Sequence, residues 1–157
     1  MELIGKSSIN PMIFYSGKIS GYVTWIIFLY SFCNKHFVYK TDYSYDDIIA
    51  SFTFFLGLIF IVVSLYHLGK STRLGLPLEK TELKTKGIYK ISRNPMYVGF
   101  GLFTMTSIIY TWNIFILIAG VYSLIVYHFI IKNEEKFLIN RFGTAYENYK
   151  KSVTRYL

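Results

Sequence analysis

The sequence is poor in cysteine and histidine, and each shortage excludes one kind of site. Cys33 is the only cysteine, so the chain forms no internal disulfide, and its place at the end of an apolar run favours a packing role. Three scattered histidines with one cysteine predict no metal site. No internal repeat, low-complexity tract or cleavable signal peptide is apparent.

Apolar and aromatic residues are abundant instead. Of 157 residues, 53% are hydrophobic and 20% are aromatic, which is too apolar for an ordinary soluble fold. Four apolar stretches, 15–33, 48–67, 96–110 and 114–131, each approach the length that crosses a bilayer. The sequence therefore predicts an all-α polytopic membrane protein with about four transmembrane helices in a single membrane domain, 1–157.

The last two stretches are separated only by Thr111-Trp112-Asn113, which predicts a tight turn and an antiparallel helical hairpin. Within the domain, 1–66 forms an N-terminal helical pair, and 67–157 holds a polar loop, the hairpin and a C-terminal tail with a cytoplasmic helix. The hairpin brings the start of the third helix beside the end of the fourth.

The distribution of basic residues predicts the orientation. The net charge is +8, and 15 of the 17 Lys and Arg residues fall on one side if the amino terminus is inside. Both termini are thus expected in the cytoplasm. Membrane topology then explains the excess of basic residues, and no basic helix remains that could recognise nucleic acid. Lys35 and Lys40 are the only Lys or Arg residues expected on the opposite face.

The polar residues that could have a functional role lie mostly in two segments that flank the hairpin. The first segment is 81–99. Gly87 permits a turn, Asn94 is a good N-cap, and Pro95 suits the first position of the third helix. A simpler interpretation makes Arg93 a positive-inside anchor and Tyr97 an interfacial aromatic residue.

The second segment begins with Glu134 and Glu135, just past the fourth apolar stretch. Two carboxylates there can be merely solvated, and the apolar residues after them can form an interfacial helix that ends at Gly143. Yet acidic residues are the minority on this basic face, and a carboxylate beside the membrane is well placed to hydrogen-bond a ribose or attract a sulfonium.

Two patterns in these segments resemble the isoprenylcysteine carboxyl methyltransferase and phospholipid methyltransferase superfamily. The patterns are Gly87-x-Tyr89-x-x-x-Arg93-Asn94-Pro95-x-Tyr97-x-Gly99 and Glu134-Glu135-x-x-Leu138-x-x-x-Phe142-Gly143-x-x-Tyr146-x-x-Tyr149. The likeness covers roughly residues 70 to 155, while 1–66 matches only in being apolar.

The resemblance implies an integral-membrane methyltransferase with an S-adenosylmethionine pocket near the cytosolic face and a lipophilic, membrane-embedded methyl acceptor. Arg93 matches the arginine of the family motif, and Glu135 matches a glutamate that contacts the cofactor. Arg93, Glu134 and Glu135 are the candidate catalytic residues: if the acceptor is an amine, Glu134 or Glu135 is the nearest base, and a carboxylate or thiolate acceptor needs none. The other implied cofactor-binding residues are Thr81, Glu82, Leu83, Lys84, Tyr89, Asn94, Pro95, Met96 and Tyr97.

Two departures from the family pattern bear on the acceptor. Asn94 replaces the histidine of the isoprenylcysteine enzymes, so that position cannot titrate near neutral pH. Those enzymes also carry an arginine four or five residues before the glutamate, where this chain has Ile130 and Ile131. A prenylcysteine carboxylate, a phospholipid amine and a small thiol all stay open as acceptors.

Two other functions stay open at this stage, and so does the oligomeric state. An NADPH-dependent sterol or ene reductase of the membrane has a similar hairpin and an Arg-x-Pro-x-Tyr-like motif, although tryptophans usually stand where Ile88 and Tyr89 are here. A small non-enzymatic membrane subunit would need only the four spans.

Overall fold

The computed structural model describes residues 7–39, 42–69 and 82–157, which contain five α-helices and no strand. The prediction of an all-α fold is therefore confirmed for this part of the chain. The helices are α1 (Pro11–Cys33), α2 (Tyr45–Leu68), α3 (Pro95–Thr111), α4 (Ile114–Phe142) and α5 (Thr144–Ser152). A short π-helix, η1 (Asn34–Val38), extends α1, and one 3₁₀ turn, η3 (Gly87–Lys90), precedes α3.

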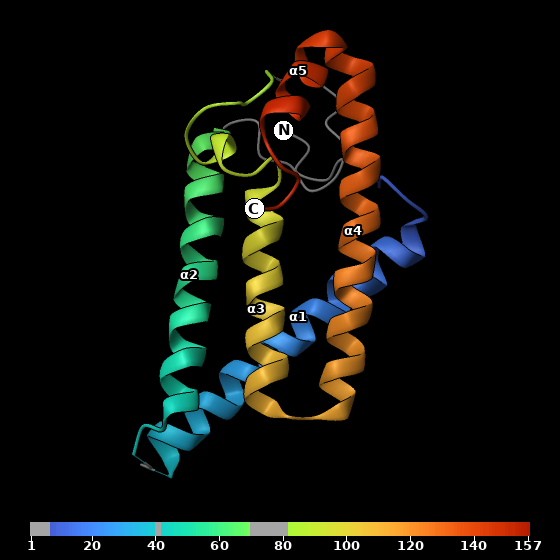
Figure 1. The fold of residues 1–157 in the computed structure, drawn as a ribbon. Coiled ribbons are helices and arrows are strands. Elements are labelled where there is room, and N and C mark those ends of the chain that lie inside the picture. The colour runs from blue at the N-terminus through green and yellow to red at the C-terminus, as the bar shows by residue number, and fades with distance from the viewer. Residues whose placement is uncertain (1–6, 40–41, 70–81) are drawn as a thin grey trace.

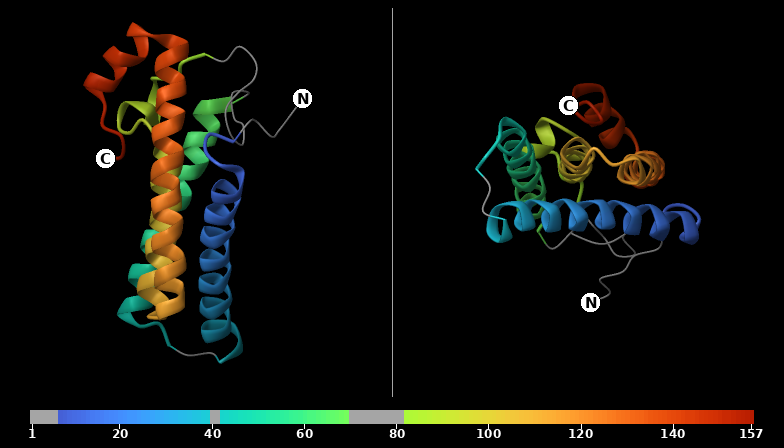
Figure 2. Two further views of the ribbon diagram at one scale, coloured as in Figure 1. Left: turned by 90° about the vertical axis from the view of Figure 1, so that its right-hand side faces the viewer. Right: turned by 90° about the horizontal axis from the view of Figure 1, so that it is seen from below.

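Three long helices stand side by side in one layer, and α1 crosses their rear face (Figure 1). Within the layer α2 packs mainly against α3, while α1 packs against α4 and α3. Figure 2 shows α1 lying along one side of the layer, with α5 and the tail that follows it on the other side. The end of the layer that carries α5 also carries η3, so the polar segments meet there.

The helix boundaries follow from local chemistry. Asn113 begins α4 by accepting a hydrogen bond from the backbone N–H of Phe115 at 2.9 Å, and the chain turns from α3 through Trp112 in a left-handed conformation. Gly143 has a φ of +53° and separates α4 from α5, as its position in the sequence predicted for a helix end. The helix that ends there is longer than expected, because α4 runs unbroken to Phe142.

Close packing of α2 on α3 depends on two glycines and two rings. The backbones of Gly57 and Gly99 approach so closely that a Cβ on Gly99 would lie 2.6 Å from the carbonyl oxygen of Gly57. Beside them the rings of Phe54 and Phe103 stack with centroids 4.3 Å apart. Small residues that let helices approach in this way are typical of helix pairs in membranes.

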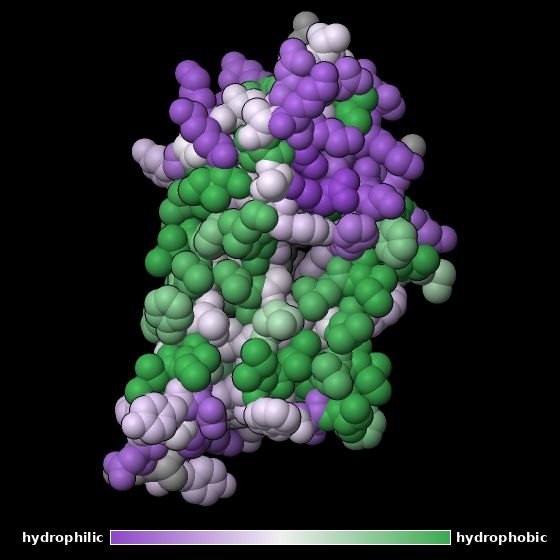
Figure 3. All heavy atoms as spheres, viewed as in Figure 1, coloured by the Kyte–Doolittle hydropathy of each residue, from purple (hydrophilic) through white to green (hydrophobic). Residues whose placement is uncertain are grey.

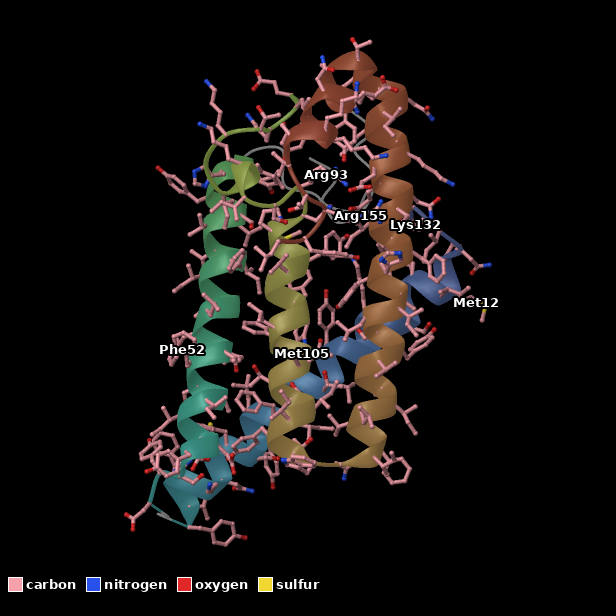
Figure 4. All side chains as sticks on the ribbon, in the orientation of Figure 1. Met12, Phe52, Arg93, Met105, Lys132 and Arg155 are labelled. Atoms are coloured by element: carbon pink, nitrogen blue, oxygen red, sulfur yellow. The ribbon has the colours of Figure 1, made fainter. Side chains whose placement is uncertain are left out.

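Three helices, α1 with η1, α2 and α4, are long and apolar enough to cross a membrane in the part of the chain that the structure describes. Helix α3 has 17 residues and falls short of this length, so the predicted count of four spans is not established. Apolar side chains cover the middle of the molecule, and hydrophilic residues gather at the end with α5 (Figure 3). Phe52, with 68% of its surface exposed, is one of the side chains that project outward from this apolar zone (Figure 4).

The opposite end of the molecule is closed by an ion pair. Asp47 in the first turn of α2 is fully buried and accepts hydrogen bonds from the Lys35 ammonium at 2.6 and 2.8 Å. The same carboxylate accepts from the backbone N–H of Ser44 at 2.7 Å, which completes a capping box at the start of the helix. These bonds join η1 to the start of α2, far from α5.

Candidate functional site

Glu135 lies at the centre of a buried ionic cluster at the α5 end. Arg93 donates to its Oε1 atom from Nε at 3.1 Å and from Nη2 at 2.9 Å, and Arg155 donates to Oε2 from Nε at 3.1 Å and from Nη2 at 2.7 Å. Only 4% of the Glu135 side chain and 6% of the Arg93 side chain are exposed. Two cations face one carboxylate, so this Arg93–Glu135–Arg155 cluster carries a net positive charge.

The backbone after α5 completes the surroundings of Arg93. Its Nη1 atom donates to the carbonyl oxygens of Lys150 and Val153 at 2.9 and 3.0 Å, and its backbone N–H donates to the carbonyl of Thr154 at 3.0 Å. The side chain of Arg93 therefore points inward between helices, as Figure 4 shows for Arg93 and Arg155. A simple anchor at the membrane surface would face water or headgroups, so that interpretation is wrong for Arg93.

Asn94 precedes α3 but does not cap it with its side chain. Helix α3 begins at Pro95 as expected, yet the Asn94 amide makes no capping hydrogen bond. It donates instead to Oε1 of Glu135 at 3.3 Å and to the carbonyl of Arg155 at 3.2 Å. The ionic cluster outcompetes the cap because hydrogen bonds to a charged acceptor are stronger than those to a neutral partner.

A second polar contact lies one turn further into α3. The Tyr97 hydroxyl donates to Oε1 of Glu134 at 2.9 Å, so both carboxylates of the acidic segment bind residues of the first segment. The two segments that the hairpin was expected to bring together do meet. Both carboxylates lie within α4, which corrects the expectation that they follow the end of the helix.

Lys18 of α1 contributes a positive charge that acts on Glu134. The side chain of Lys18 is buried, and its ammonium lies 4.2 Å from the centroid of the Phe14 ring. The Lys18 side chain therefore does not reach out to the membrane–water interface, as a lysine near the end of a spanning helix often does. A buried ammonium needs a nearby anion, and Glu134 is the carboxylate that provides it.

A cavity of about 130 Å³ opens beside the ionic cluster. Four residues implied by the family resemblance line it, namely Glu82, Leu83, Lys84 and Tyr89, together with Arg93. Its remaining walls come from α2, α4 and α5: Leu68, Leu138, Phe142, Tyr146 and Tyr149. Aromatic rings, one guanidinium and one carboxylate thus share a small concave site.

The tyrosines of this cavity are held in place from several elements. The Tyr149 hydroxyl of α5 donates to the carbonyl oxygen of Tyr89 in η3 at 2.6 Å. Burial raises the pKa of Tyr149 to about 12, and burial also raises the pKa of Tyr89 and Tyr146. All three rings are therefore neutral at physiological pH and present uncharged aromatic faces.

The remaining residues implied by the family resemblance do not line this cavity. Pro95 and Met96 occupy the first turn of α3, and Pro95 is fully buried. Glu135 does not line the cavity either, and its two oxygens accept hydrogen bonds from Arg93 and Arg155. Thr81 lies outside the described residues.

Arg155 is the main site residue that the sequence analysis missed. It lies 20 positions after Glu135, in a tail with no distinctive spacing, and was counted only as a basic residue of the cytoplasmic face. Ile130 and Ile131, which stand where related enzymes carry an arginine, are 0% and 1% exposed. Those two positions are packed, and the second cation beside Glu135 comes from the tail.

Comparisons with known proteins identify the family of the chain. The family model described as phospholipid methyltransferase matches residues 46–145. A protein-S-isoprenylcysteine O-methyltransferase of Dictyostelium discoideum is 39% identical over 72 residues, covering 45% of this chain and 30% of that protein. A methanethiol S-methyltransferase of Crocosphaera subtropica is 30% identical over 138 residues, covering 78% of this chain and 52% of that protein.

A third relative, a protein-S-isoprenylcysteine O-methyltransferase of Schizosaccharomyces pombe, is 35% identical over 74 residues, covering 45% of this chain and 30% of that protein. The chain thus spans about half the length, or less, of these curated relatives. No solved structure matches. The matched region runs from the start of α2 to the start of α5 and contains Arg93 and both glutamates, and this chain belongs to the phospholipid methyltransferase family.

Proposed function

We propose that this protein transfers a methyl group from S-adenosylmethionine to a lipophilic acceptor that reaches it from the bilayer. The observation that carries the proposal is the convergence of the two polar segments, in which Arg93 binds Glu135 and Tyr97 binds Glu134. Membership of a methyltransferase family supports the reaction type. The relatives named for prenylcysteine and methanethiol support an acceptor that is small or lipophilic.

The residues around the 130 Å³ cavity have the chemistry that S-adenosylmethionine requires. The neutral rings of Tyr89, Tyr146 and Tyr149 suit an adenine face and a sulfonium, which aromatic rings attract as they do other cations. The excess positive charge of the Arg93–Glu135–Arg155 cluster suits the carboxylate of the cofactor. Glu82, whose side chain is 85% exposed, offers an acceptor for ribose hydroxyls or an ammonium.

The cavity is smaller than the roughly 300–1,000 Å³ of typical ligand sites, so binding requires its wall to move. Residues 82–86 are the part of that wall with no helix. The ion pair of Glu82 with Lys84 at 3.0 Å joins two residues of this segment to each other, and Leu83 packs against the cluster that contains Tyr89, Tyr146 and Tyr149. Displacement of this segment leaves the ionic cluster intact. We therefore propose that 82–86 opens to admit the cofactor and closes over it.

Bound S-adenosylmethionine supplies a methyl group on a positively charged sulfur. The protein's part is to align donor and acceptor and to exclude water, and alignment alone can contribute about 7–11 kcal/mol in the best-oriented cases. Arg93 orients the cofactor, Glu135 and Arg155 hold Arg93 in place, and Tyr97 with Glu134 shapes the side nearest the bilayer. Glu135 then acts as a positioning residue, which revises the direct cofactor contact that the family pattern implied.

We also propose that α3 is a fourth span and that the α5 end faces the cytoplasm. Helix α3 lies between α2 and α4 over its whole length, so it shares their depth in the membrane (Figure 1). Apart from Lys35, the basic residues of the described chain lie toward the α5 end, which the positive-inside rule places in the cytoplasm.

The test is a transfer assay with the detergent-purified protein, methyl-labelled S-adenosylmethionine and a lipid extract of the host. Labelled product in the lipid fraction, together with saturable binding of S-adenosylmethionine and none of NADPH, is the expected result. NADPH binding would favour the reductase. A folded protein that binds neither nucleotide and labels no fraction would refute the enzymatic assignment.

A further inference from the structure

A second cavity lies at the end of the molecule opposite α5. Its volume is about 620 Å³, and its walls include Ile27 and Ser31 of α1, Asp46 at the start of α2, and Tyr110, Trp112 and Phe115 around the turn from α3 to α4. A smaller group of hydrophilic side chains lies at this end, below the apolar zone (Figure 3). We call it the distal cavity, because the whole length of the layer separates it from the 130 Å³ cavity.

The course of α1 leaves this space open. Near its start, α1 packs on α4, where the backbone of Gly17 lies directly against Val126. At its other end, η1 reaches the start of α2 through the bonds from Lys35 to Asp47. Because α1 thus passes from α4 to α2 along its length (Figure 2), its last turns diverge from the start of α4, and the distal cavity lies between them.

Lys35 and Asp46 are the charged residues among those described that line the distal cavity. The Lys35 ammonium donates to both carboxylate oxygens of Asp47, at 2.6 and 2.8 Å, and to the Ser44 hydroxyl at 3.3 Å. The charge of Lys35 and its three protons are thereby engaged. Asp46 is exposed and forms no ion pair with a described residue, so the cavity has one unbalanced negative charge, which attracts a cation.

The side chains that line the cavity with Asp46 suit an organic ammonium. Trp112 and Phe115 are 87% and 77% exposed and present aromatic rings, which attract such cations. The Ser31 hydroxyl forms no hydrogen bond with a described residue, and the Thr111 hydroxyl donates to a backbone carbonyl at 2.7 Å, so both oxygens can accept from an N–H group. One carboxylate, two hydroxyl oxygens and two rings thus line the same cavity.

The deeper part of the lining is apolar. Ile27 lies one turn before Ser31 in α1, and Ile116 follows Phe115 in α4, so both isoleucines are nearer the apolar middle of the molecule. Exposed aromatic residues such as Trp112 are typical of the membrane–water interface. A ligand with a polar head and an alkyl chain therefore meets matching surfaces at both of its ends.

From this arrangement we infer that the distal cavity binds the ammonium headgroup of a membrane lipid. Asp46 is the counter-ion of the headgroup, Trp112 and Phe115 lie beside it, and the lipid chain follows Ile27 and Ile116 into the bilayer. The cavity lies at the end opposite the ionic cluster, so this lipid takes no part in methyl transfer. The inference is therefore independent of the proposed function.

Other occupants fit the distal cavity less well. An anionic headgroup meets the carboxylate of Asp46, while the ammonium of Lys35 is already bound to Asp47. An uncharged headgroup leaves the charge of Asp46 unbalanced. A small soluble amine satisfies Asp46 but has no chain to cover Ile27 and Ile116.

Photolabelling tests the site. The protein in a neutral detergent is irradiated with a long-chain alkylamine that carries a diazirine near its head, and separately with the matched alkanol and alkanoate, and labelled peptides are mapped by mass spectrometry. Labelling of 52–59, on the lipid-facing side of α2, corrects for partition into the micelle. We expect the amine to label 27–31 and 112–116 at least about fivefold more than the alkanol does. Equal labelling by the amine and the alkanol, or stronger labelling by the alkanoate, would overturn the inference.

Competition identifies the source of the ammonium. Phosphatidylethanolamine and phosphatidylglycerol with the same chains share their phosphate, so the ammonium is the charged group that distinguishes them. We expect the first lipid to displace the labelled amine and the second to leave it bound, and we expect free ethanolamine to need a concentration at least about 100-fold higher, because it buries no chain. Equal displacement by both lipids, or by ethanolamine at the same concentration, would refute a lipid ammonium as the ligand.

Two neighbouring aspartates test the counter-ion. Asp46→Asn keeps the size of the side chain and removes its charge, and we expect it to lower labelling by the amine about fivefold while labelling by the alkanol stays unchanged. Asp42→Asn is the matched control, because Asp42 is also exposed but does not line the cavity. Equal effects of the two substitutions would show that Asp46 is not the counter-ion.

Substitutions at Ser31 fill or spare the cavity. We expect Ser31→Ala to keep labelling by the amine and Ser31→Leu, whose larger side chain enters the cavity, to lower it at least about fivefold, with thermal unfolding as the check on the fold. Equal labelling of the two variants would contradict the site. Failure of the proposed function is a separate result: methyl transfer would be absent although the amine still labels the distal cavity.

Discussion

Arg155 and Glu135, twenty residues apart in sequence, lie in direct contact, with 2.7 Å between Nη2 and Oε2. This pair ties the tail after α5 to the middle of α4. The carbonyl of Arg155 also accepts hydrogen bonds from Ser92 and Asn94 at the start of α3. One residue of the tail therefore connects the two helices of the hairpin.

Substitution of Arg155 should release this connection. Arg155→Ala leaves one buried oxygen of Glu135 without its donors, which costs about 1–3 kcal/mol. We expect a lower thermal unfolding midpoint and a loss of methyl transfer, measured on detergent-purified protein. Arg155→Lys is the matched control, because it keeps the charge but not the paired donors, and it should recover stability more than activity.

Glu135→Gln tests the ionic cluster from its centre. An amide leaves the buried guanidinium of Arg93 without a counter-charge, and breaking a buried pair in this way typically costs about 3–5 kcal/mol. We expect severe destabilisation and no transfer in any folded fraction. Glu147→Gln in α5 is the control, since that side chain is exposed, and it should behave as the parent protein.

The sequence predicted the helices well because their boundaries depend on local chemistry. Pro95 and Asn113 begin α3 and α4, and Gly143 ends α4, as short-range rules expect. The end of α4 was misjudged because its apolar run stops near Ile131, whereas the helix continues on a polar face to Phe142. A run of apolar residues marks the part of a helix that suits contact with lipid. A helix that continues beyond the membrane has polar residues there, although its backbone hydrogen bonds continue, so hydropathy does not show where it ends.

The candidate site was predictable only in part. Arg93, Tyr97 and the two glutamates belong to segments whose spacing and hairpin geometry indicate proximity, and their contacts follow that expectation. Lys18 and Arg155 come from distant segments, and only tertiary packing brings them to Glu134 and Glu135. No short-range pattern encodes such a meeting, so both were grouped with the ordinary basic residues of the cytoplasmic face.

The contact of α2 with α3 provides a prediction about stability. Gly99→Ala places a Cβ 2.6 Å from the carbonyl oxygen of Gly57, and a backbone atom cannot move aside cheaply. We expect destabilisation of about 1–3 kcal/mol, which is typical of overpacking, measured by thermal unfolding in detergent. Gly101→Ala, two residues away, would bring its Cβ into ordinary contact with the Cδ2 atom of Leu124 at 3.9 Å. This substitution should be neutral or slightly stabilising, and equal effects at the two positions would contradict the packing.

Removing the hydrogen bond between Tyr97 and Glu134 allows an effect on catalysis to be distinguished from an effect on stability. Tyr97→Phe keeps the ring in place and removes one hydrogen bond, a loss of about 0.5–1.5 kcal/mol in stability. We expect kcat to fall at least about tenfold, equivalent to about 1.4 kcal/mol in the barrier, because Glu134 is no longer oriented. Tyr66→Phe on the exposed surface of α2 is the control and should leave both quantities unchanged.

Breaking the ion pair of Lys35 with Asp47, at the end of the molecule opposite α5, should lower stability without affecting methyl transfer. Asp47→Asn removes the charge that binds Lys35, and the loss of charge-assisted bonds to a buried carboxylate costs about 1–3 kcal/mol. Along α2 this position lies roughly 30 Å from Leu68, which lines the 130 Å³ cavity. We expect a lower unfolding midpoint with unchanged transfer per folded molecule. A selective loss of transfer would mean that the two ends of the bundle are coupled, because no residue near Asp47 lines the 130 Å³ cavity.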